Sequence, residues 1–107
     1  MFDRKYSVFV DDNYHYGDES ERVSHGKFRK LDDAIAACRK ITRDSLRSFY
    51  EPGMTVDKLK AQWLLFGDDP FIRGSDVSVP FSARQYLSEE LCQQILAERI
   101  ESRSRPG

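Results

Sequence analysis

One long amphipathic stretch in the first half of the chain constrains the fold most strongly. Asp32 and Asp33 open it, where helical N–H groups favour anions. Pro52 and Gly53 cannot continue a helix, so the stretch must end by Glu51. The sequence therefore predicts a long helix whose apolar stripe needs a second layer to cover. The stripe recurs at helical spacing, with one slip near residue 45, through Leu31, Ala34, Ile35, Cys38, Ile41, Leu46 and Phe49.

The N-terminal segment supplies the start of that second layer. Residues 6–16 alternate as a strand does and are rich in aromatic and β-branched residues, although positions 11–13 favour a bulge or a break. Turn-forming residues at 17–20 precede a second strand at 22–28, so we expect a β-hairpin. A four-residue loop would place Tyr14 opposite Val23 and Asp12 opposite His25, with His15 and His25 on opposite faces. A loop one residue shorter or longer would bring both histidines to the same face.

The middle of the chain is ambiguous between helix and strand. Thr55 can cap a short helix, and Val56, Leu59, Trp63 and Phe66 would continue it as an apolar stripe. The four apolar residues at 63–66 also fit a buried strand. We expect the strand, because a hairpin alone is marginal in water and a third strand stabilises it. A loop is then expected at 67–79.

The last helix has a clear beginning, and it completes the predicted fold. Ser82 and Gln85 have capping-box spacing, and Ser88 can cap a restart within the helix. We predict one α+β domain over residues 1–102 and a flexible tail at 103–107. Its order is N-terminal β-hairpin, long helix, short helix, third strand and C-terminal helix, with the helices packed on one face of a small sheet.

Composition indicates the cellular compartment of the protein more than its function. The 107 residues carry a net charge of −1, and no apolar window is long enough for a membrane span. The first residues lack the apolar run of a signal peptide, so we expect a cytoplasmic protein. Cys38 and Cys92 lie on the apolar sides of predicted helices, and we expect them to be reduced core residues.

A group of acids, aromatics and histidines at the hairpin is the candidate binding surface. Several acids between residues 11 and 21 stand without a neighbouring base, and with the histidines they could bind a hard cation or serve acid–base chemistry. The calcium-loop template fails, because Tyr16 stands where glycine is needed and Arg22 where an acid is needed. The plainer interpretation is a solvated turn whose acids pair with Arg22, Lys27 or Arg29. The candidate residues are Asp11, Asp12, Asn13, Tyr14, His15, Tyr16, Asp18, Glu19 and His25.

Neither catalysis nor a cofactor is predicted. The sequence has no nucleophile elbow, phosphate-binding glycine loop or zinc-protease motif. Cys38 lies among apolar residues, which argues against a reactive thiolate. We therefore predict no catalytic residue, metal site or cofactor.

A basic stripe on the long helix offers a different kind of surface. Arg39, Arg43 and Arg47 follow one another at i+4 spacing, with Lys40 beside them. A nucleic-acid backbone would bind such a stripe, but Asp44 interrupts it and the chain as a whole is not basic. The alternative is the solvated face of an amphipathic helix.

The order of several short segments resembles a group of short, uncharacterised bacterial proteins that form a domain of unknown function. The resemblance rests on Val-Asp-Asp-Asn at residues 10–13, with His-Tyr, Asp-Glu and Glu-Arg pairs at 15–22 and Gly26 after them. Ala-Ile-Ala-Ala-Cys at 34–38 and Gly-Asp-Asp-Pro-Phe-Ile at 67–72 complete it. It covers residues 6 to 87. It implies a bacterial, cytoplasmic, stand-alone domain and assigns no residue a role.

Three functions follow, in order of preference. The first is a non-enzymatic interaction module that binds an unknown protein or a second copy of itself as a homodimer. The second is a metal-dependent or acid–base enzyme that uses Asp11, Asp12, His15 and Glu19. The third is nucleic-acid binding through the basic stripe.

Overall fold

The chain folds into a three-stranded antiparallel sheet and four α-helices over the residues that the computed structural model describes, 6–15, 18–74 and 80–104. Two 3-10 turns connect the first two strands. This is the α+β class that the sequence predicts. The elements in chain order are β1 (Tyr6–Asp12), η1 (Asn13–His15), η2 (Glu19–Glu21), β2 (Val23–Phe28), α1 (Leu31–Ser48), α2 (Val56–Phe66), β3 (Asp68–Arg73), α3 (Ala83–Tyr86) and α4 (Glu89–Ser104).

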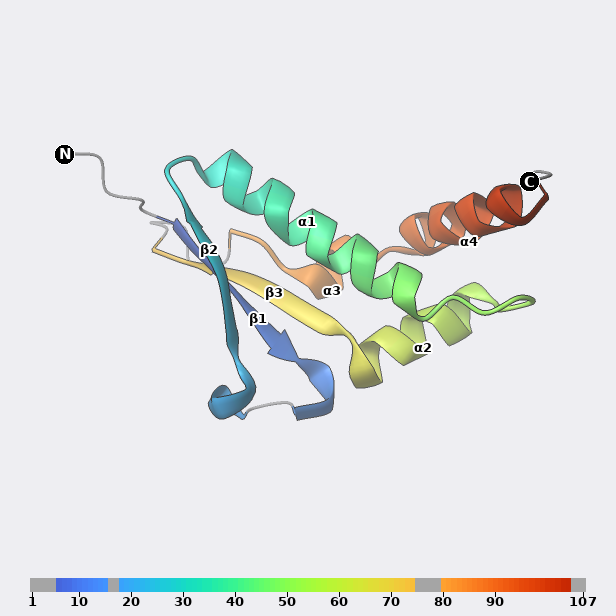
Figure 1. Cartoon of the computed structure of the whole chain (residues 1–107), viewed down its shortest axis with the longest axis horizontal. Coiled ribbons are helices and arrows are strands. Elements are labelled where there is room, and N and C mark those ends of the chain that lie inside the picture. The colour runs from blue at the N-terminus through green and yellow to red at the C-terminus, as the bar shows by residue number, and fades with distance from the viewer. Residues whose placement is uncertain (1–5, 16–17, 75–79, 105–107) are drawn as a thin grey trace.

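The long helix α1 covers one face of the sheet (Figure 1). The strand order is β2-β1-β3, so the N-terminal strand is the central one. Val8 of β1 and Ile72 of β3 pack against Ala34 and Cys38 of α1 in one apolar cluster. Both cysteines of the chain, Cys38 and Cys92, are buried and free, as expected of core residues.

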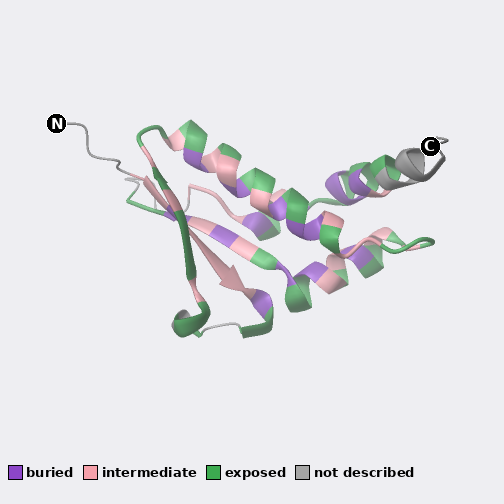
Figure 2. Cartoon of the chain, viewed as in Figure 1, coloured by how far each residue is buried: buried purple, intermediate pink, exposed green. Residues whose placement is uncertain are grey.

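A second apolar cluster lies beyond the sheet, where the helices meet one another. The far end of α1 contributes Leu46, and α2 contributes Leu59 and Trp63, all with no exposed surface. The buried positions of α1 lie toward the other elements in Figure 2, whereas β2 is exposed along most of its length. Among the described helices, none is long and apolar enough to cross a membrane. The cluster is completed by Ala83, Leu87, Leu91, Cys92 and Ile95.

The slip in the apolar stripe of α1 is filled by two buried polar residues. The Thr42 hydroxyl donates to the carbonyl of Cys38 (2.9 Å), and the Ser45 hydroxyl accepts from the backbone N–H of Asp68 (3.0 Å). Because both side chains are hydrogen-bonded, their burial carries no unpaired polar group. Ser45 also ties α1 to the start of β3.

The face of the sheet away from α1 is covered by its own side chains. Residues paired across the strands point to the same face, and Phe9 pairs with Phe71. Their rings stack with centroids 5.8 Å apart, and Arg22 and Arg73 lie over them at 4.8 to 5.6 Å. Arginine side chains can cover apolar surface while keeping their charge in water. This layer explains how the face does without a helix in the described part of the chain.

The prediction of a strand at residues 63–66 is wrong, because these residues are the last turn of α2. The Thr55 hydroxyl accepts from the Lys58 N–H, as predicted for a cap, but the helix then runs on to Phe66. The third strand is β3, inside the segment that we expected to be a loop; residues 75–79 of that segment lie outside the description. Its Asp-Asp-Pro beginning hides the strand signal, and Pro70 is accommodated because β3 is an edge strand.

The predicted hairpin register is also wrong. Val10, not Tyr14, pairs with Val23, because β1 ends at Asp12 and the chain then enters 3-10 turns. Asp12 therefore does not face His25. Phe9 pairs with Ser24 and Val8 with Gly26, so His25 is the extra residue of a β-bulge.

The C-terminal region follows its capping signals. The Ser82 hydroxyl accepts from the Gln85 N–H, and the Ser88 hydroxyl accepts from the Leu91 N–H at the restart. Helix α4 continues to Ser104 and so includes the first two residues of the predicted tail. Residues 105–107 lie outside the description.

Candidate functional site

Asn13 fastens the end of the hairpin to the end of α2. Its backbone N–H donates to the carbonyl of Gly67 (3.0 Å), and its side-chain Nδ2 donates to the carbonyl of Trp63 (2.8 Å). The Trp63 carbonyl also accepts from the Gly67 N–H (2.8 Å), so the Asn13 amide adds a second hydrogen bond at the end of the helix. Asn13 is buried. It is therefore a supporting residue and not part of an exposed binding surface.

Gly67 makes that junction close. A Cβ added at residue 67 would lie 2.4 Å from Trp63 Cδ1 and 2.6 Å from the Trp63 carbonyl oxygen. Only glycine leaves room for this approach of backbone to indole. The Trp63 Nε1–H donates to the carbonyl of Asp68 (3.2 Å), which fixes the ring from the other side.

This junction presents an exposed apolar surface. The Tyr14 ring stacks on Phe66 with centroids 5.6 Å apart, and the edge of His15 meets the Tyr14 ring at 4.9 Å. Tyr14 is 65% exposed, Leu65 58% and Phe66 45%. Together with Leu64 these residues form what we call the Tyr14–Phe66 patch. It holds four of the five large exposed apolar side chains of the described residues.

The carboxylates of Asp11, Asp12 and Asp18 near the patch form hydrogen bonds or ion pairs with other residues of the chain. Asp11 accepts two hydrogen bonds from Arg22, at 2.7 and 3.1 Å. Asp12 accepts from the Tyr14 backbone N–H (2.9 Å) and pairs with His15 Nδ1 (3.0 Å). Asp18 accepts from the N–H and the hydroxyl of Ser20. The pairing of Asp11 with Arg22 is the one that the solvated-turn interpretation expects.

These contacts shift the titration of two exposed groups. The hydrogen bond to Asp12 raises the pKa of His15, with a further contribution from the charge of Glu21. The hydrogen bonds from Ser20 lower the pKa of Asp18. Both shifts favour the charged form of the group. Asp18 is therefore ionised at neutral pH, and His15 is protonated in mild acid.

Two further acids lie beside the predicted ones. The register of β1 and β3 pairs Asp11 with Asp69 and Asp12 with Asp68. Burial raises the pKa of both Asp68 and Asp69, and the charges of Asp12 and Asp11 add to the respective shifts. Sequence reasoning missed these acids because it read their segment as a loop. No group of three or more metal-binding side chains occurs among the described residues.

The predicted surface thus divides into separate parts. Asp12, Tyr14 and His15 are brought together, whereas the exposed His25 lies in the bulge of β2. Tyr16 and the side chain of Glu19 lie outside the description. Leu65 and Phe66 were missed, because the strand prediction treated them as buried. For Leu65 the signal was the helical alternative, which places residue 65 away from the stripe of Leu59 and Trp63. That alternative includes Phe66 in the stripe and so gave no signal for its exposure.

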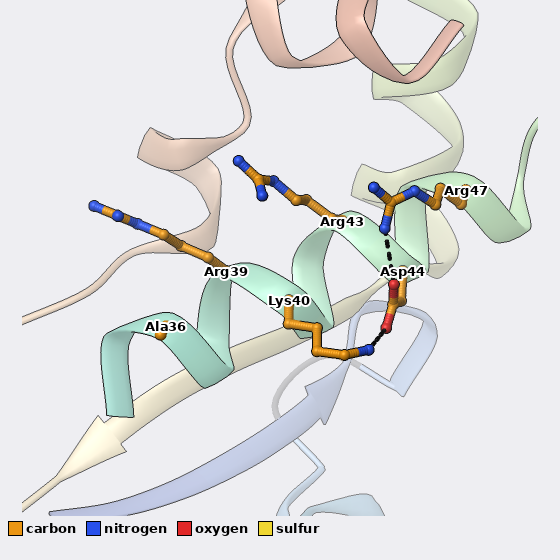
Figure 3. Close-up of a pocket in the computed structure, with 6 residues that line it drawn as sticks. All are labelled: Ala36, Arg39, Lys40, Arg43, Asp44 and Arg47. Atoms are coloured by element: carbon orange, nitrogen blue, oxygen red, sulfur yellow. Dashed lines mark hydrogen bonds and ion pairs between the residues drawn. The ribbon is translucent and has the colours of Figure 1, made fainter. Parts of the chain in front are cut away.

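The basic stripe of α1 divides as well (Figure 3). Lys40 pairs with Asp44, and Arg47 bridges Asp44 (3.0 Å) and Glu98 (3.1 Å). Arg39 and Arg43 instead extend over the ring of Tyr86, at 5.6 and 5.8 Å from its centroid. A pocket of about 340 Å³ lies along this side of the helix.

The buried thiols are unsuited to nucleophilic chemistry. Burial raises the pKa of Cys38 to about 12 and also raises the pKa of Cys92. The thiolate is the nucleophile, and at neutral pH almost none of it would be present.

Comparison with known proteins adds no relative: no family model matches the chain, and no curated protein or solved structure is significantly similar to it. The resemblance to short bacterial proteins stays a prediction. We therefore infer function from the surfaces of the chain itself.

Proposed function

We propose that this protein is a non-enzymatic protein-binding module whose contact surface is the Tyr14–Phe66 patch. The observation that carries the proposal is the stacking of exposed Tyr14 on exposed Phe66, with Leu65 exposed at the preceding position of α2. Exposed apolar groups that adjoin one another mark interaction sites, and tyrosine is enriched among the residues that dominate binding energy.

The patch is held in place before any partner arrives. Asn13 anchors the turn to α2, and the Tyr14 ring stacks on Phe66 and makes a T-shaped contact with His15. Ordering a surface in advance reduces the entropy lost on binding. This rigidity favours a contact surface over an incidental exposure of apolar groups.

The charges beside the patch indicate the kind of partner. Asp12 ends β1, and Asp18 lies in the connection between β1 and β2. Glu21 lies near enough to raise the pKa of His15, and the exposed Asp68 lies just beyond the end of α2. An acidic surround steers and selects a basic partner. We therefore assign the patch a protein segment with apolar or aromatic anchors flanked by lysine or arginine.

Selection from a library of random peptides displayed on phage tests this assignment. Peptides selected on the immobilised protein should carry apolar anchors with basic flanks. Fluorescence anisotropy should show that Y14A and L65S weaken their binding by about tenfold or more. The matched control is V23S, which removes an equally exposed apolar side chain from β2, at the opposite edge of the sheet from β3.

Three outcomes would overturn the proposal. They are a failure of the library to enrich any sequence, binding that survives both patch substitutions, and equal loss in V23S. Sedimentation velocity over a range of concentrations adds a fourth. A dimer that Y14A or L65S dissociates would show that the occupant is a second copy of the chain.

A further inference from the structure

We propose that Arg39 and Arg43 of α1, arranged by Tyr86, form a binding site for the phosphate group of a small phosphate ester. Neighbouring cations on this face of α1 differ in their ion pairs. Lys40 and Arg47 are neutralised by Asp44 and Glu98. Within the described residues, the structure shows no carboxylate in an ion pair with Arg39 or Arg43.

The two unneutralised arginines converge on one aromatic ring. Positions 39 and 43 stand one turn apart on α1, and both guanidinium groups lie within 6 Å of the Tyr86 ring centroid, at 5.6 and 5.8 Å. Figure 3 shows the two side chains extending in parallel from the helix, away from Lys40 and Asp44. Two like charges held side by side repel each other, and an anion bound between them would relieve that repulsion.

The ring arranges these side chains without using their hydrogen bonds. A guanidinium stacked near an aromatic face keeps its N–H groups available at its edge. Tyr86 is itself held by α3 and by Phe81, whose ring centroid lies 5.8 Å away. Much of the side-chain entropy that binding would otherwise cost is therefore lost already on folding.

A pocket beside the arginines is large enough for the ligand. It is an open surface pocket of about 340 Å³ along the outer side of α1. The pocket is also lined by Lys40, Asp44 and Arg47, but these three are already engaged in ion pairs, so the cations available in it are Arg39 and Arg43. Glu90 lines a neighbouring cavity together with Arg43, so a carboxylate bounds the proposed site on that side.

Phosphate suits this arrangement better than a carboxylate or a nucleic-acid strand. One guanidinium fork satisfies a carboxylate, whereas two forks on successive turns can share the oxygens of a tetrahedral phosphate. A single strand needs aromatic faces for its bases, and here the aromatic group is occupied by the arginines. The site therefore fits one phosphate group with a small substituent.

NMR titration of the whole protein with inorganic phosphate and with a nucleoside monophosphate tests the site. The side-chain N–H signals of Arg39 and Arg43 should move in a saturable way at constant ionic strength, while those of Arg22 and Arg73 stay in place. R39Q and R43Q should each weaken the affinity about tenfold or more. K58Q, which removes an equal charge from exposed Lys58 on α2, should change it less than twofold.

Variants of Tyr86 separate positioning from folding. Y86F keeps the ring and should bind as the wild type does, whereas Y86L should bind more weakly although its unfolding transition remains cooperative. Equal shifts at every basic residue, or equal effects of R39Q and K58Q, would overturn the site. Binding only to a single-stranded oligonucleotide, with no saturable response to phosphate or the mononucleotide, would overturn the small ligand.

Discussion

The acidic end of the hairpin and the basic face of α1 are both dense in charge, yet they leave different groups free. At the hairpin, Asp11 pairs with Arg22 and Asp12 with His15, and the large apolar side chains of the Tyr14–Phe66 patch are exposed beside these pairs. On α1, Asp44 and Glu98 neutralise Lys40 and Arg47, whereas no carboxylate among the described residues forms an ion pair with Arg39 or Arg43. Charge content alone therefore says little about what a surface can bind.

The Tyr14–Phe66 patch depends on the junction of the hairpin and α2, and G67A should disrupt this junction most severely. The added methyl group would overlap Trp63, including its carbonyl oxygen, so the helix end must shift. We expect a loss of about 1–3 kcal/mol in the free energy of unfolding. Urea unfolding followed by the fluorescence of Trp63, the chain's one tryptophan, measures it.

The control for that substitution is G26A. At residue 26 an added Cβ would meet only Phe28, at 3.8 Å or more, which is ordinary contact. Its effect should remain within about 0.5 kcal/mol. Equal losses in the two variants would show that Gly67 has no special role in the junction.

N13A should have the next largest effect, because it removes one hydrogen bond from the same junction. The Trp63 carbonyl would still accept from the Gly67 N–H, so we expect a loss of about 1 kcal/mol. Hydrogen exchange at the Tyr14 and His15 amides should accelerate at the same time. Unchanged exchange would mean that the turn does not depend on the Asn13 side chain.

On the basic face of α1, we expect a smaller difference in stability between variants of two arginines. R47Q breaks contacts with Asp44 and Glu98 and should destabilise the protein by about 0.5 kcal/mol, as exposed ion pairs do. R39Q breaks no ion pair shown by the described residues and should cost less. Thermal unfolding in low salt measures both, and a larger loss for R39Q would contradict the division of the stripe.

The smallest effect is a dependence of stability on pH at the hairpin end. Asp12 raises the pKa of His15 from its ordinary 6.5, so the folded state holds the proton more tightly than the unfolded state does. This stabilisation is complete below the ordinary pKa and disappears as the pH rises through the raised one. In NMR titrations D12N should lower the midpoint of His15. An unaltered midpoint would show that the pair does not form in solution.

The fold could be predicted from sequence where local signals were strong. Pro52 and Gly53 limited α1, and Ser82 and Ser88 marked real helix beginnings. The prediction failed where tertiary contacts outweigh local pattern. Residues 63–66 stay helical because Leu59 and Trp63 complete a buried stripe, and β3 forms despite Asp68, Asp69 and Pro70 because β1 offers it a partner.

The candidate surfaces were only partly accessible to sequence reasoning. Tyr14 could be chosen as an exposed aromatic, but its contact with Phe66 depends on the junction that Asn13 and Gly67 form across some fifty residues of chain. The difference between Arg39 and Arg47 was equally hidden, since it depends on Glu98 of α4 and Tyr86 of α3. Long-range contacts of this kind leave no local pattern.

The most direct test compares Y14A with D18N in binding the selected peptides. If the hairpin end binds through its apolar groups, Y14A should reduce affinity at least about tenfold, and D18N only a few-fold, with that smaller loss vanishing in high salt. A greater loss in D18N than in Y14A would mean that the carboxylates make the contact and would contradict the account.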